Sequence, residues 1–258
     1  MSIQIPLARR DVIAARLATG QAVVAVKLAE EFDVSEDAVR RDLRALAAEG
    51  LCRRVYGGAL PVTPAYRPMA ARMGEASERK EALAKAAIPL IESGELIFLD
   101  SGSTNFALVG WLPEDRDLTV ATNSIDTAAA ILRRPDLKLL LVGGAIDSVV
   151  GGAVDAQATL TVMRLNIDRC FLGACSISGQ RGVSALNEAD AIFKRALLER
   201  SQHTAVLATN NKFAAKAHYH VTPLEHVTHF VVEHDIPSEA LATLKTSGST
   251  VITAGHRT

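Results

Sequence analysis

The sequence predicts a small helical domain followed by a larger α/β domain built on a mainly parallel sheet. Three helical patterns and a short basic hairpin fill residues 1–60, whereas from residue 95 onward short apolar runs alternate with amphipathic helical patterns. Residues 61–68 hold three prolines in eight positions, which suits a semi-rigid spacer because proline disrupts helices. With 258 residues, 48% of them hydrophobic, the chain can bury two cores. We therefore place a first domain at 1–60, a linker at 61–77 and a second domain at 78–258.

Charge, cysteine content and apolar runs exclude several classes of protein. The formal net charge is −1, so any attraction to nucleic acid has to come from a local cluster of cations. Three cysteines without a Cys-x-x-Cys pair are typical of reduced thiols in the cytoplasm. His218 and His220 lack a third ligand at a convincing spacing, so we predict no metal site and no cofactor. The absence of a signal peptide and of an apolar run near roughly 18 residues predicts a soluble cytoplasmic protein without a membrane partner.

The first two helices of the small domain are expected near residues 10–19 and 26–32. Gly20 ends the first of them, because a residue without a Cβ readily terminates a helix. A tight break at 33–35 separates the second helix from a third. The apolar residues that we expect on the inner sides of the first two helices are Val12, Ile13, Leu17, Val26, Leu28, Ala29 and Phe32.

The third helix has a predicted cap, a buried stripe and a cationic face. Ser35 is well placed to cap its first turn, where Glu36 and Asp37 suit the helix dipole. The buried stripe consists of Val39, Leu43 and Leu46, at positions i, i+4 and i+7. Arg40 and Arg44 share the exposed face, with Arg41 beside them, an arrangement that suits insertion into the major groove of DNA.

Residues 49–58 predict a wing of two short strands around a turn. Arg53 and Arg54 lie on it, where they would reach phosphates of the DNA backbone. The alternative is a solvated helix in a protein-binding module. Such helices seldom combine a cap, paired arginines, an apolar stripe and a glycine-ended wing. We therefore predict a winged helix-turn-helix that binds DNA.

The same segment resembles the DNA-binding signature of the DeoR family of bacterial regulators. The resemblance rests on residues 35–43, Ser-Glu-Asp-Ala-Val-Arg-Arg-Asp-Leu, on Glu-Gly-Leu at 49–51 and on Arg-Val-Tyr-Gly-Gly-Ala at 54–59. The family usually has Thr-Ile where this chain has Ala38-Val39, so one hydroxyl group is absent. It implies a double-stranded DNA operator as partner, contacted through Ser35, Glu36, Ala38, Arg40, Arg41, Arg44, Arg53, Arg54 and Tyr56.

Seven apolar runs predict the strands of the second domain. These runs are apolar throughout rather than alternating, which is typical of strands buried on both faces of a parallel sheet. They occupy residues 96–99, 118–121, 137–142, 170–172, 205–208, 230–232 and 250–252. Helical patterns lie between them at 78–92, 104–112, 125–133, 188–200 and 238–245.

Polar turns follow four of these strands and predict a ligand site. The first strand runs into Asp100-Ser101-Gly102-Ser103-Thr104 and a helix, and such a turn can hold a phosphate through free N–H groups and hydroxyls. It is also compatible with an ordinary strand-to-helix connection, and no Walker or dinucleotide motif occurs. In a parallel sheet these turns meet at one edge, where α/β proteins bind ligands. The other turns are Thr122-Asn123-Ser124, Gly143-Gly144 and Gly173-Ala174.

Residues 78–235 resemble the effector-binding domain of the DeoR family. The matching pieces include Glu78-Arg79-Lys80, residues 98–104, Lys194-Arg195 and Lys212-Phe213. The resemblance implies a fold similar to ribose-5-phosphate isomerase and the CoA transferases, and a phosphorylated sugar or polyol as effector. It further implies that residues 100–104 hold the phosphate and sugar, that Asn123 and Gly144 line the pocket, and that Lys194 and Lys212 supply cations.

Two segments depart from the family pattern. Thr209-Asn210-Asn211 stands where the family has an aspartate and two serines, which removes a carboxylate that would contact a sugar hydroxyl. Residues 186–190 replace a more acidic stretch, and Glu188 is placed either in the pocket or in solvent. Lys194 has a second interpretation as a solvated charge opposite an Ile192/Ala196 stripe.

Three functions are compatible with this organisation. The first is a repressor of a sugar or polyol operon, released by a phosphorylated effector and acting as a homodimer or homotetramer. The second is a sugar-phosphate isomerase, but the Asp-Gly-Ala-Asp-Glu and Lys-Gly-Gly-Gly segments of such enzymes are absent from this sequence. The third is a DNA-organising protein with a purely structural second domain. We predict the first, without catalytic residues.

Overall fold

The structure, a computed structural model, describes residues 6–18, 21–61 and 68–255. The chain divides into two compact units, Met1–Ala71 and Arg72–Thr258. Within the segment predicted as a linker, Pro61 closes a strand and Met69–Met73 form a short helix, α4; residues 62–67 lie outside the described residues. Helix formation begins directly after the last proline, where Met, Ala and Arg favour it.

The first unit is a helix-turn-helix with a small antiparallel sheet, as predicted. Strand β3 lies between β1 and β2 in the sheet, and β2 and β3 form the wing. Ile13, Leu28 and Leu43 contribute to a core that all three helices share. The elements are α1 (Pro6–Ala18), β1 (Val23–Val24), α2 (Ala25–Phe32), α3 (Glu36–Ala48), β2 (Cys52–Val55) and β3 (Gly58–Pro61).

Two residues expected on the inner sides of these helices are exposed. Val12 is 40% exposed and Val26 is 49% exposed, so both predictions were wrong. Each lies one position, and therefore about 100° around the helix, from a residue that does face the core, Ile13 or Ala25. The predicted helix end at Gly20 lies outside the described residues.

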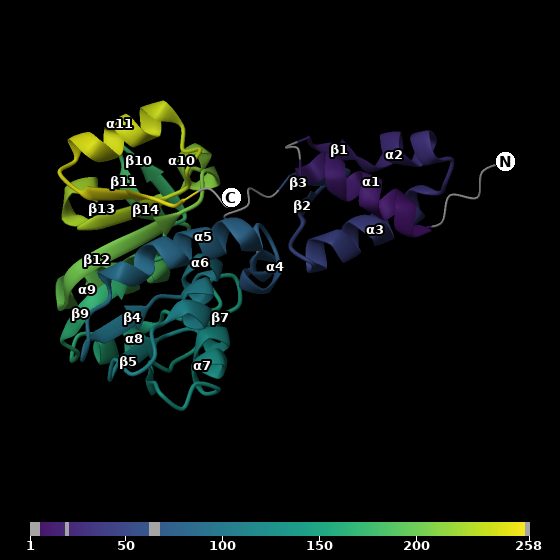
Figure 1. The fold of residues 1–258 in the computed structure, drawn as a ribbon. Coiled ribbons are helices and arrows are strands. Elements are labelled where there is room, and N and C mark those ends of the chain that lie inside the picture. The colour runs from purple at the N-terminus through teal and green to yellow at the C-terminus, as the bar shows by residue number, and fades with distance from the viewer. Residues whose placement is uncertain (1–5, 19–20, 62–67, 256–258) are drawn as a thin grey trace. The chain divides into compact units, whose positions relative to one another are not determined.

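A seven-stranded, wholly parallel sheet forms the centre of the second unit (Figure 1). Its strand order is β15-β14-β12-β9-β4-β5-β6. Each of the seven apolar runs contributes one strand, which confirms the predicted sheet. The strands are β4 (Leu96–Leu99), β5 (Thr119–Thr122), β6 (Lys138–Leu141), β9 (Ile167–Phe171), β12 (Ser201–Ala208), β14 (His229–Val232) and β15 (Thr250–Thr253).

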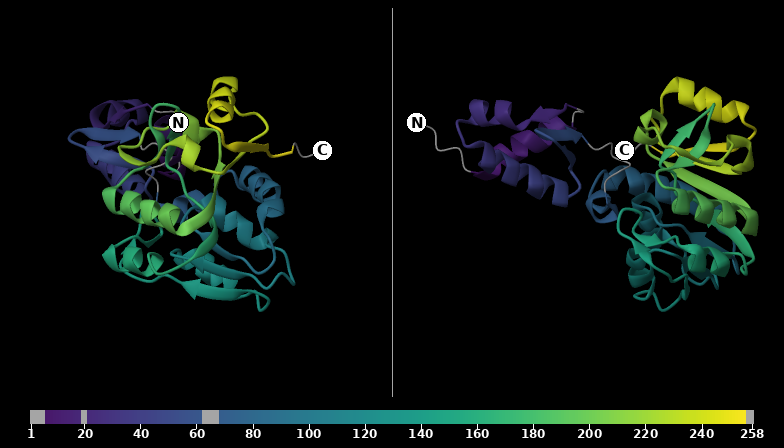
Figure 2. Two further views of the ribbon diagram at one scale, coloured as in Figure 1. Left: turned by 90° about the vertical axis from the view of Figure 1, so that its left-hand side faces the viewer. Right: turned by 180° about the vertical axis from the view of Figure 1, so that it is seen from behind.

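Helices cover both faces of this sheet (Figures 1 and 2). Alternate residues of a strand serve opposite faces: Phe98 packs with residues of α8 and α9, whereas Ile97 and Leu99 pack with α5 and the helical turn η3. Residue Asp100 follows directly, at the carboxyl end of β4. The helices are α5 (Ser77–Ala87), α6 (Ser103–Phe106), α7 (Ile125–Ile131), α8 (Ala156–Val162), α9 (Glu188–Arg200), α10 (Asn211–Ala214) and α11 (Ser238–Thr246), with 3-10 turns η2 (Ile88–Leu90), η3 (Ala107–Trp111) and η4 (Leu224–His226).

Two small antiparallel sheets accompany the main one and were not predicted. A hairpin pairs β7 (Ile146–Asp147) with β8 (Gly152–Ala153). A three-stranded sheet has the order β10-β11-β13, with β10 at Ser176–Ser178, β11 at Gly182–Ala185 and β13 at Tyr219–Thr222. Cys175 N–H donates to the carbonyl of Ser184, which begins this sheet just beyond the carboxyl end of β9.

Candidate functional site

Helix α3 has the cap, the buried stripe and the exposed arginines that the sequence predicts for a DNA-reading helix. The Ser35 hydroxyl accepts a hydrogen bond from the N–H of Ala38 at 3.2 Å, which caps the first turn. The stripe of Val39, Leu43 and Leu46 is at most 2% exposed and seats the helix on the core. Packing by that face leaves the opposite face to solvent, and Arg40, Arg41 and Arg44 are exposed there.

The arginines of this face are only weakly engaged within the unit. Arg40 pairs with Glu36 one turn earlier at 2.6 Å, and both side chains are substantially exposed. An exposed pair of this kind contributes only about 0.2–1 kcal/mol, so DNA phosphates can displace it. Within the part of the chain that the structure describes, Arg44 donates to the carbonyl of Arg40 at 3.4 Å and to no other group. The half-buried acid Asp42 is held instead by Arg9, at 2.6 Å, which ties α1 to α3.

The wing carries further exposed groups. Arg53 and Arg54 of β2 are exposed, and Tyr56 at the turn is completely so. Gly57 has a φ of +80°, which explains why the turn needs a glycine. A Cβ on Gly58 would lie 2.0 Å from the carbonyl oxygen of Val23, so only glycine lets β3 approach β1. Helix α3 and the wing thus present the predicted cations and tyrosine to solvent.

In the second unit, a buried cluster of charges lies at the carboxyl ends of the parallel strands. The Lys194 ammonium lies 2.7 Å from Asp100 and 2.6 Å from Asp190. All three side chains are at most 4% exposed. Desolvation opposes the charge of Lys194, but the two carboxylates outweigh it and raise the pKa of the ammonium. Desolvation raises the pKa of Asp100, against the pull of Lys194.

Two hydrogen bonds reach the carboxylate of Asp100, and both go to the same oxygen. The Oδ2 atom accepts from Lys194 and from the N–H of Gly173, the latter at 2.8 Å. A Cβ on Gly173 would lie 2.9 Å from that same oxygen, so glycine is required for the close approach. The Oδ1 atom is buried and has no partner within the described residues. A buried acceptor without a donor indicates a place for an absent group.

The turns after β4 and β5 are joined by side-chain hydrogen bonds. Asn123 Oδ1 accepts from the N–H of Ser101 at 3.0 Å, and its amide nitrogen donates to Ser101 Oγ at 3.2 Å. Thr122 Oγ1 donates to the carbonyl of Leu99, and Ser124 Oγ caps α7. The structure therefore brings the predicted turns at 100–101, 122–124 and 173 together.

The anion-binding helix end that the sequence suggests is short. Helix α6 covers only Ser103–Phe106 before the chain continues as a 3-10 turn, so its dipole is weak. Gly102 has an extended φ of 170°, and a Cβ there would meet nothing closer than 3.9 Å. Ser103 is buried and Thr104 partly so, directly beside the turn. Positive charge at this edge comes mainly from side chains.

Lys212 supplies one of those charges. It lies in α10, just beyond the end of β12, and within the described residues its ammonium has no hydrogen bond or ion pair. Desolvation lowers the pKa of Lys212 to about 8; the nearby positive charges of Arg72, Lys80 and Lys194 add to this effect, and Cys175 opposes it. An unpaired ammonium among other cations provides an attractive position for an anion.

Three further predicted pocket residues pack on a helix cap or face solvent, and their role in the pocket stays a prediction. Gly144 packs against Asp155, where a Cβ would meet a carboxylate oxygen at 2.4 Å, and Gly143 is exposed beside it. Asp155 uses its carboxylate to cap α8, so these glycines shape that cap. Glu188 is exposed at the start of α9.

The orientation of helix α9 decides between the two interpretations of Lys194. Ile192 is 45% exposed while Lys194 is 2% exposed, so the interpretation of Lys194 as a solvated charge opposite Ile192 was wrong. Asp190, which pairs with Lys194, was not assigned to the site from the sequence. Its spacing of four residues from Lys194 was the available signal, because such residues are neighbours on one helix face.

Residues of the unusual Thr209-Asn210-Asn211 segment form hydrogen bonds with one another and with residues that follow β14. Thr209 Oγ1 donates to Asn211 Oδ1 at 2.6 Å. Asn210 donates its amide nitrogen to Asp235 Oδ1 at 2.9 Å and its backbone N–H to Glu233. These contacts tie the end of β12 to the end of β14, and the segment presents no carboxylate of its own.

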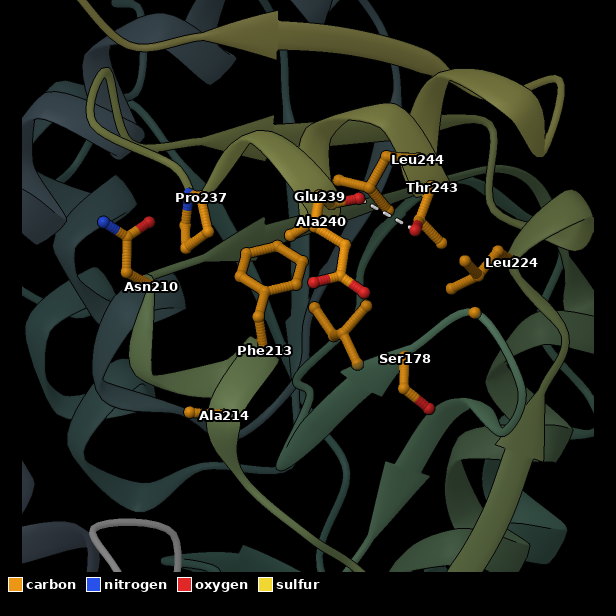
Figure 3. A pocket seen from close by; sticks show the side chains of 12 residues that line it. Ser178, Asn210, Phe213, Ala214, Leu224, Pro237, Glu239, Ala240, Thr243 and Leu244 are labelled. Atoms are coloured by element: carbon orange, nitrogen blue, oxygen red, sulfur yellow. Dashed lines mark hydrogen bonds between the residues drawn. The ribbon is translucent and has the colours of Figure 1, made fainter.

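A separate, mostly apolar cavity of about 310 Å³ lies between α10, α11 and β10 (Figure 3). Phe213, Leu224 and Leu244 line it, and Glu239 carries its only carboxylate. Figure 3 shows the Thr243 hydroxyl hydrogen-bonded to the backbone of Glu239, at 2.9 Å. None of the predicted effector residues lines this cavity.

Comparisons with known proteins agree with this arrangement. The DeoR C terminal sensor domain matches residues 75–234, and the DeoR-like helix-turn-helix domain matches residues 9–64. The putative aga operon transcriptional repressor of Escherichia coli O157:H7 is 30% identical over 96% of this chain and 94% of its own length. The glycerol-3-phosphate regulon repressor of Escherichia coli K12 is 31% identical over 74% of this chain and 76% of its own.

The solved structures similar to this chain include ribose 5-phosphate isomerase A from Methanocaldococcus jannaschii. It is 15% identical, covers 53% of this chain and 54% of its own, and superimposes with a TM-score of 0.39. Among the helices of the described residues, none is both long and apolar enough to cross a membrane.

Proposed function

This chain belongs to the DeoR family of DNA-binding transcriptional regulators, and from that premise we propose that it represses a sugar or polyol operon and is released from its operator by a phosphorylated intermediate. The family membership places it among regulators rather than enzymes. Repression takes place in the cytoplasm on double-stranded DNA. The full-length match to a protein described as an operon repressor supports this direction of control.

The exposed cations of the first unit support operator binding. Arg40, Arg41 and Arg44 project from a capped helix, and Arg53 and Arg54 from the wing beside it. Helix arginines would read base edges while wing arginines contact phosphates. One such module covers few base pairs, so the protein acts as a homodimer or homotetramer on a two-fold operator.

The observation that carries the effector proposal is the incomplete charge cluster at the strand ends. Asp100 offers a buried oxygen that can accept a hydrogen bond from a hydroxyl group, and Lys212 offers an ammonium that is unpaired among the described residues. A ligand that satisfies both groups carries hydroxyls and an anion, as a phosphorylated sugar or polyol does. The buried Lys194 bridge fixes the position of Asp100 and gives the site a rigid base.

The proposal is tested by gel shift on the DNA that flanks the protein's own gene. Wild-type protein should retard this DNA, and one of a panel of phosphate esters should reverse the shift. Replacing Arg40 and Arg44 by Ala should abolish the shift but keep the ester-induced rise in thermal stability. In the matched control variant, Ala replaces Arg133 and Arg164, two exposed arginines of the second unit. This variant should bind DNA as the wild type does.

The effector side is tested with Gly102→Val. The position has room for the added carbons within the fold, and the valine would fill the approach to the turn. This variant should bind the operator but ignore the ester. If no ester in a broad panel changes operator binding, the proposed release by an effector is contradicted. That result would favour a purely structural role for the second unit.

A further inference from the structure

A chain of contacts runs from the effector turn to the hairpin β7–β8. Asn123 exchanges two hydrogen bonds with Ala153 of this hairpin, both at 3.0 Å. Gly152 lies so close to the turn that a Cβ there would be 2.9 Å from the hydroxyl of Ser101. The hairpin therefore rests directly on the residues that form the base of the site.

The tip of the same hairpin holds Arg72. The Arg72 guanidinium donates to the carbonyl of Val149 at 3.1 Å. Asp147 accepts from the N–H groups of Val149 and Val150 at 2.8 and 3.0 Å, which fixes the tip in its conformation. One side chain thus connects the hairpin to helix α4.

The Arg72 guanidinium is not fully satisfied by this contact. Its Nε–H is buried and has no partner within the described residues, which leaves the donor desolvated without compensation. Lys80 donates its ammonium to the backbone carbonyl of Arg72, so a second cation lies close by. The positive charge of Arg72 contributes to lowering the pKa of Lys212, and Asp190 at the base of the site attracts Arg72.

Of the neighbouring carboxylates, Glu75 attracts Arg72 and Lys80, whereas the two at the base of the site are already engaged. Asp100 and Asp190 are both engaged by Lys194 at hydrogen-bond distance. Among the described residues, the Lys212 ammonium has no hydrogen bond or ion pair, and the Nε–H of Arg72 has no acceptor. Planar guanidinium donors and ammonium donors are the groups that proteins use to bind phosphate, and a dianion would complete both.

Arg72 has a special position in the chain. It is the first residue of the second compact unit, and helix α4, which contains it, begins at Met69 in the first. A contact that pulls on Arg72 therefore acts on the backbone that leads to the DNA-binding unit.

We propose that Arg72 and Lys212 together hold the anionic group of the effector, and that the contact to Arg72 transmits occupancy of the site to helix α4. This inference rests on the effector function proposed above. In an occupied site, the anion accepts a hydrogen bond from the Nε–H of Arg72. The bound anion is then connected through Arg72 to both the hairpin and helix α4. In an empty site the Arg72 guanidinium donates to Val149, and its Nε–H has no acceptor among the described residues. Ligand binding thus changes the contacts of Arg72, the residue at which the second unit begins. A ligand can alter operator affinity only through such a difference between the empty and the occupied state.

The test measures binding of glycerol 3-phosphate, ribose 5-phosphate and inorganic phosphate to the full chain by calorimetry. For each anion that the wild type binds, Arg72→Gln and Lys212→Met should weaken affinity about tenfold or more, the usual effect of losing a charge-assisted hydrogen bond. Arg72→Lys should lose less, because it keeps the charge. Arg116→Gln is the matched control, since Arg116 also donates to one backbone carbonyl but lies before β5, at the opposite edge of the sheet.

The same variants are then assayed for operator release. Arg72→Gln should need more ester than the wild type to leave the operator, in proportion to its loss of ester affinity. Wild-type affinity for the anions in both Arg72 variants would overturn the inference but leave the effector proposal standing. If no anion binds the wild-type protein, both fail. An unfolding curve without ligand verifies that each variant is folded.

Discussion

Replacing Lys194 by Met should destabilise the second unit strongly. Met keeps the length and apolar stem of Lys194 but removes the ammonium that lies 2.7 Å from Asp100 and 2.6 Å from Asp190. Both carboxylates would then remain buried without a cation. Removing one partner of a buried ion pair typically costs about 3–5 kcal/mol, and here two acids lose the same partner.

The loss should depend on pH. Without Lys194, burial would raise the pKa of Asp100 above its value in the unfolded chain, so the folded state would favour the protonated acid. A group of this kind stabilises the fold at low pH and loses that contribution as the pH rises through its folded pKa. The Lys194→Met variant should therefore be closer to wild type at pH 5 than at pH 8.

Urea unfolding measures the free energy of unfolding of the second unit at each pH. The signal is the fluorescence of Trp111, the only tryptophan of the chain, which lies in that unit. Adding Asp100→Asn to Lys194→Met should recover part of the loss, since one stranded charge disappears. The control is Lys138→Met, which breaks an exposed pair with Asp117 and should change little. A loss below about 1 kcal/mol, or one independent of pH, would refute the reasoning.

Three further outcomes test other parts of the structure. Ser35→Ala should lower the stability of the first unit by about 0.5–2 kcal/mol in thermal unfolding, with Ser35→Asp near wild type; equal loss in both would argue against the cap. Gly173→Ala should weaken the response to ester, because the new Cβ would lie 2.9 Å from Asp100, whereas Gly110→Ala meets no atom within 4 Å and should respond normally in the same calorimetric titration. Ester affinity should fall as the pH rises through about 8, because the Lys212 ammonium loses its proton there, and a flat profile between pH 7 and 9 would exclude it from the site.

The main sheet could be predicted because its strands are apolar throughout. The central strands are buried on both faces between two helical layers, whereas the edge strand β6 leaves Leu141 52% exposed. The small sheets were missed because their strands are two to four residues long and lack an apolar run, as in Ser176–Ser178. Helix α8 was missed for a related reason, since its seven residues include two threonines, which favour strands.

From the residues alone, the site could be predicted where its members follow strands, whereas Lys194 and Lys212 were assigned through the family resemblance. Asp100, Asn123 and Gly173 are found by that rule, because parallel strands end at one edge. Gly144 satisfies the same rule but serves a helix cap, which depends on where Asp155 lies in space. Arg72 precedes the sheet entirely, and no local pattern announces that its side chain reaches the hairpin tip.

The central claim is that effector and operator binding are linked, and the reciprocal titration tests it most directly. The affinity of the releasing ester is measured twice by calorimetry, on the free protein and on the protein saturated with operator DNA. Thermodynamic linkage requires the ester to bind more weakly in the complex, by the same factor, about 5–150-fold, by which it weakens operator binding. Equal ester affinity with and without operator would show that the two units do not communicate, and would contradict the account.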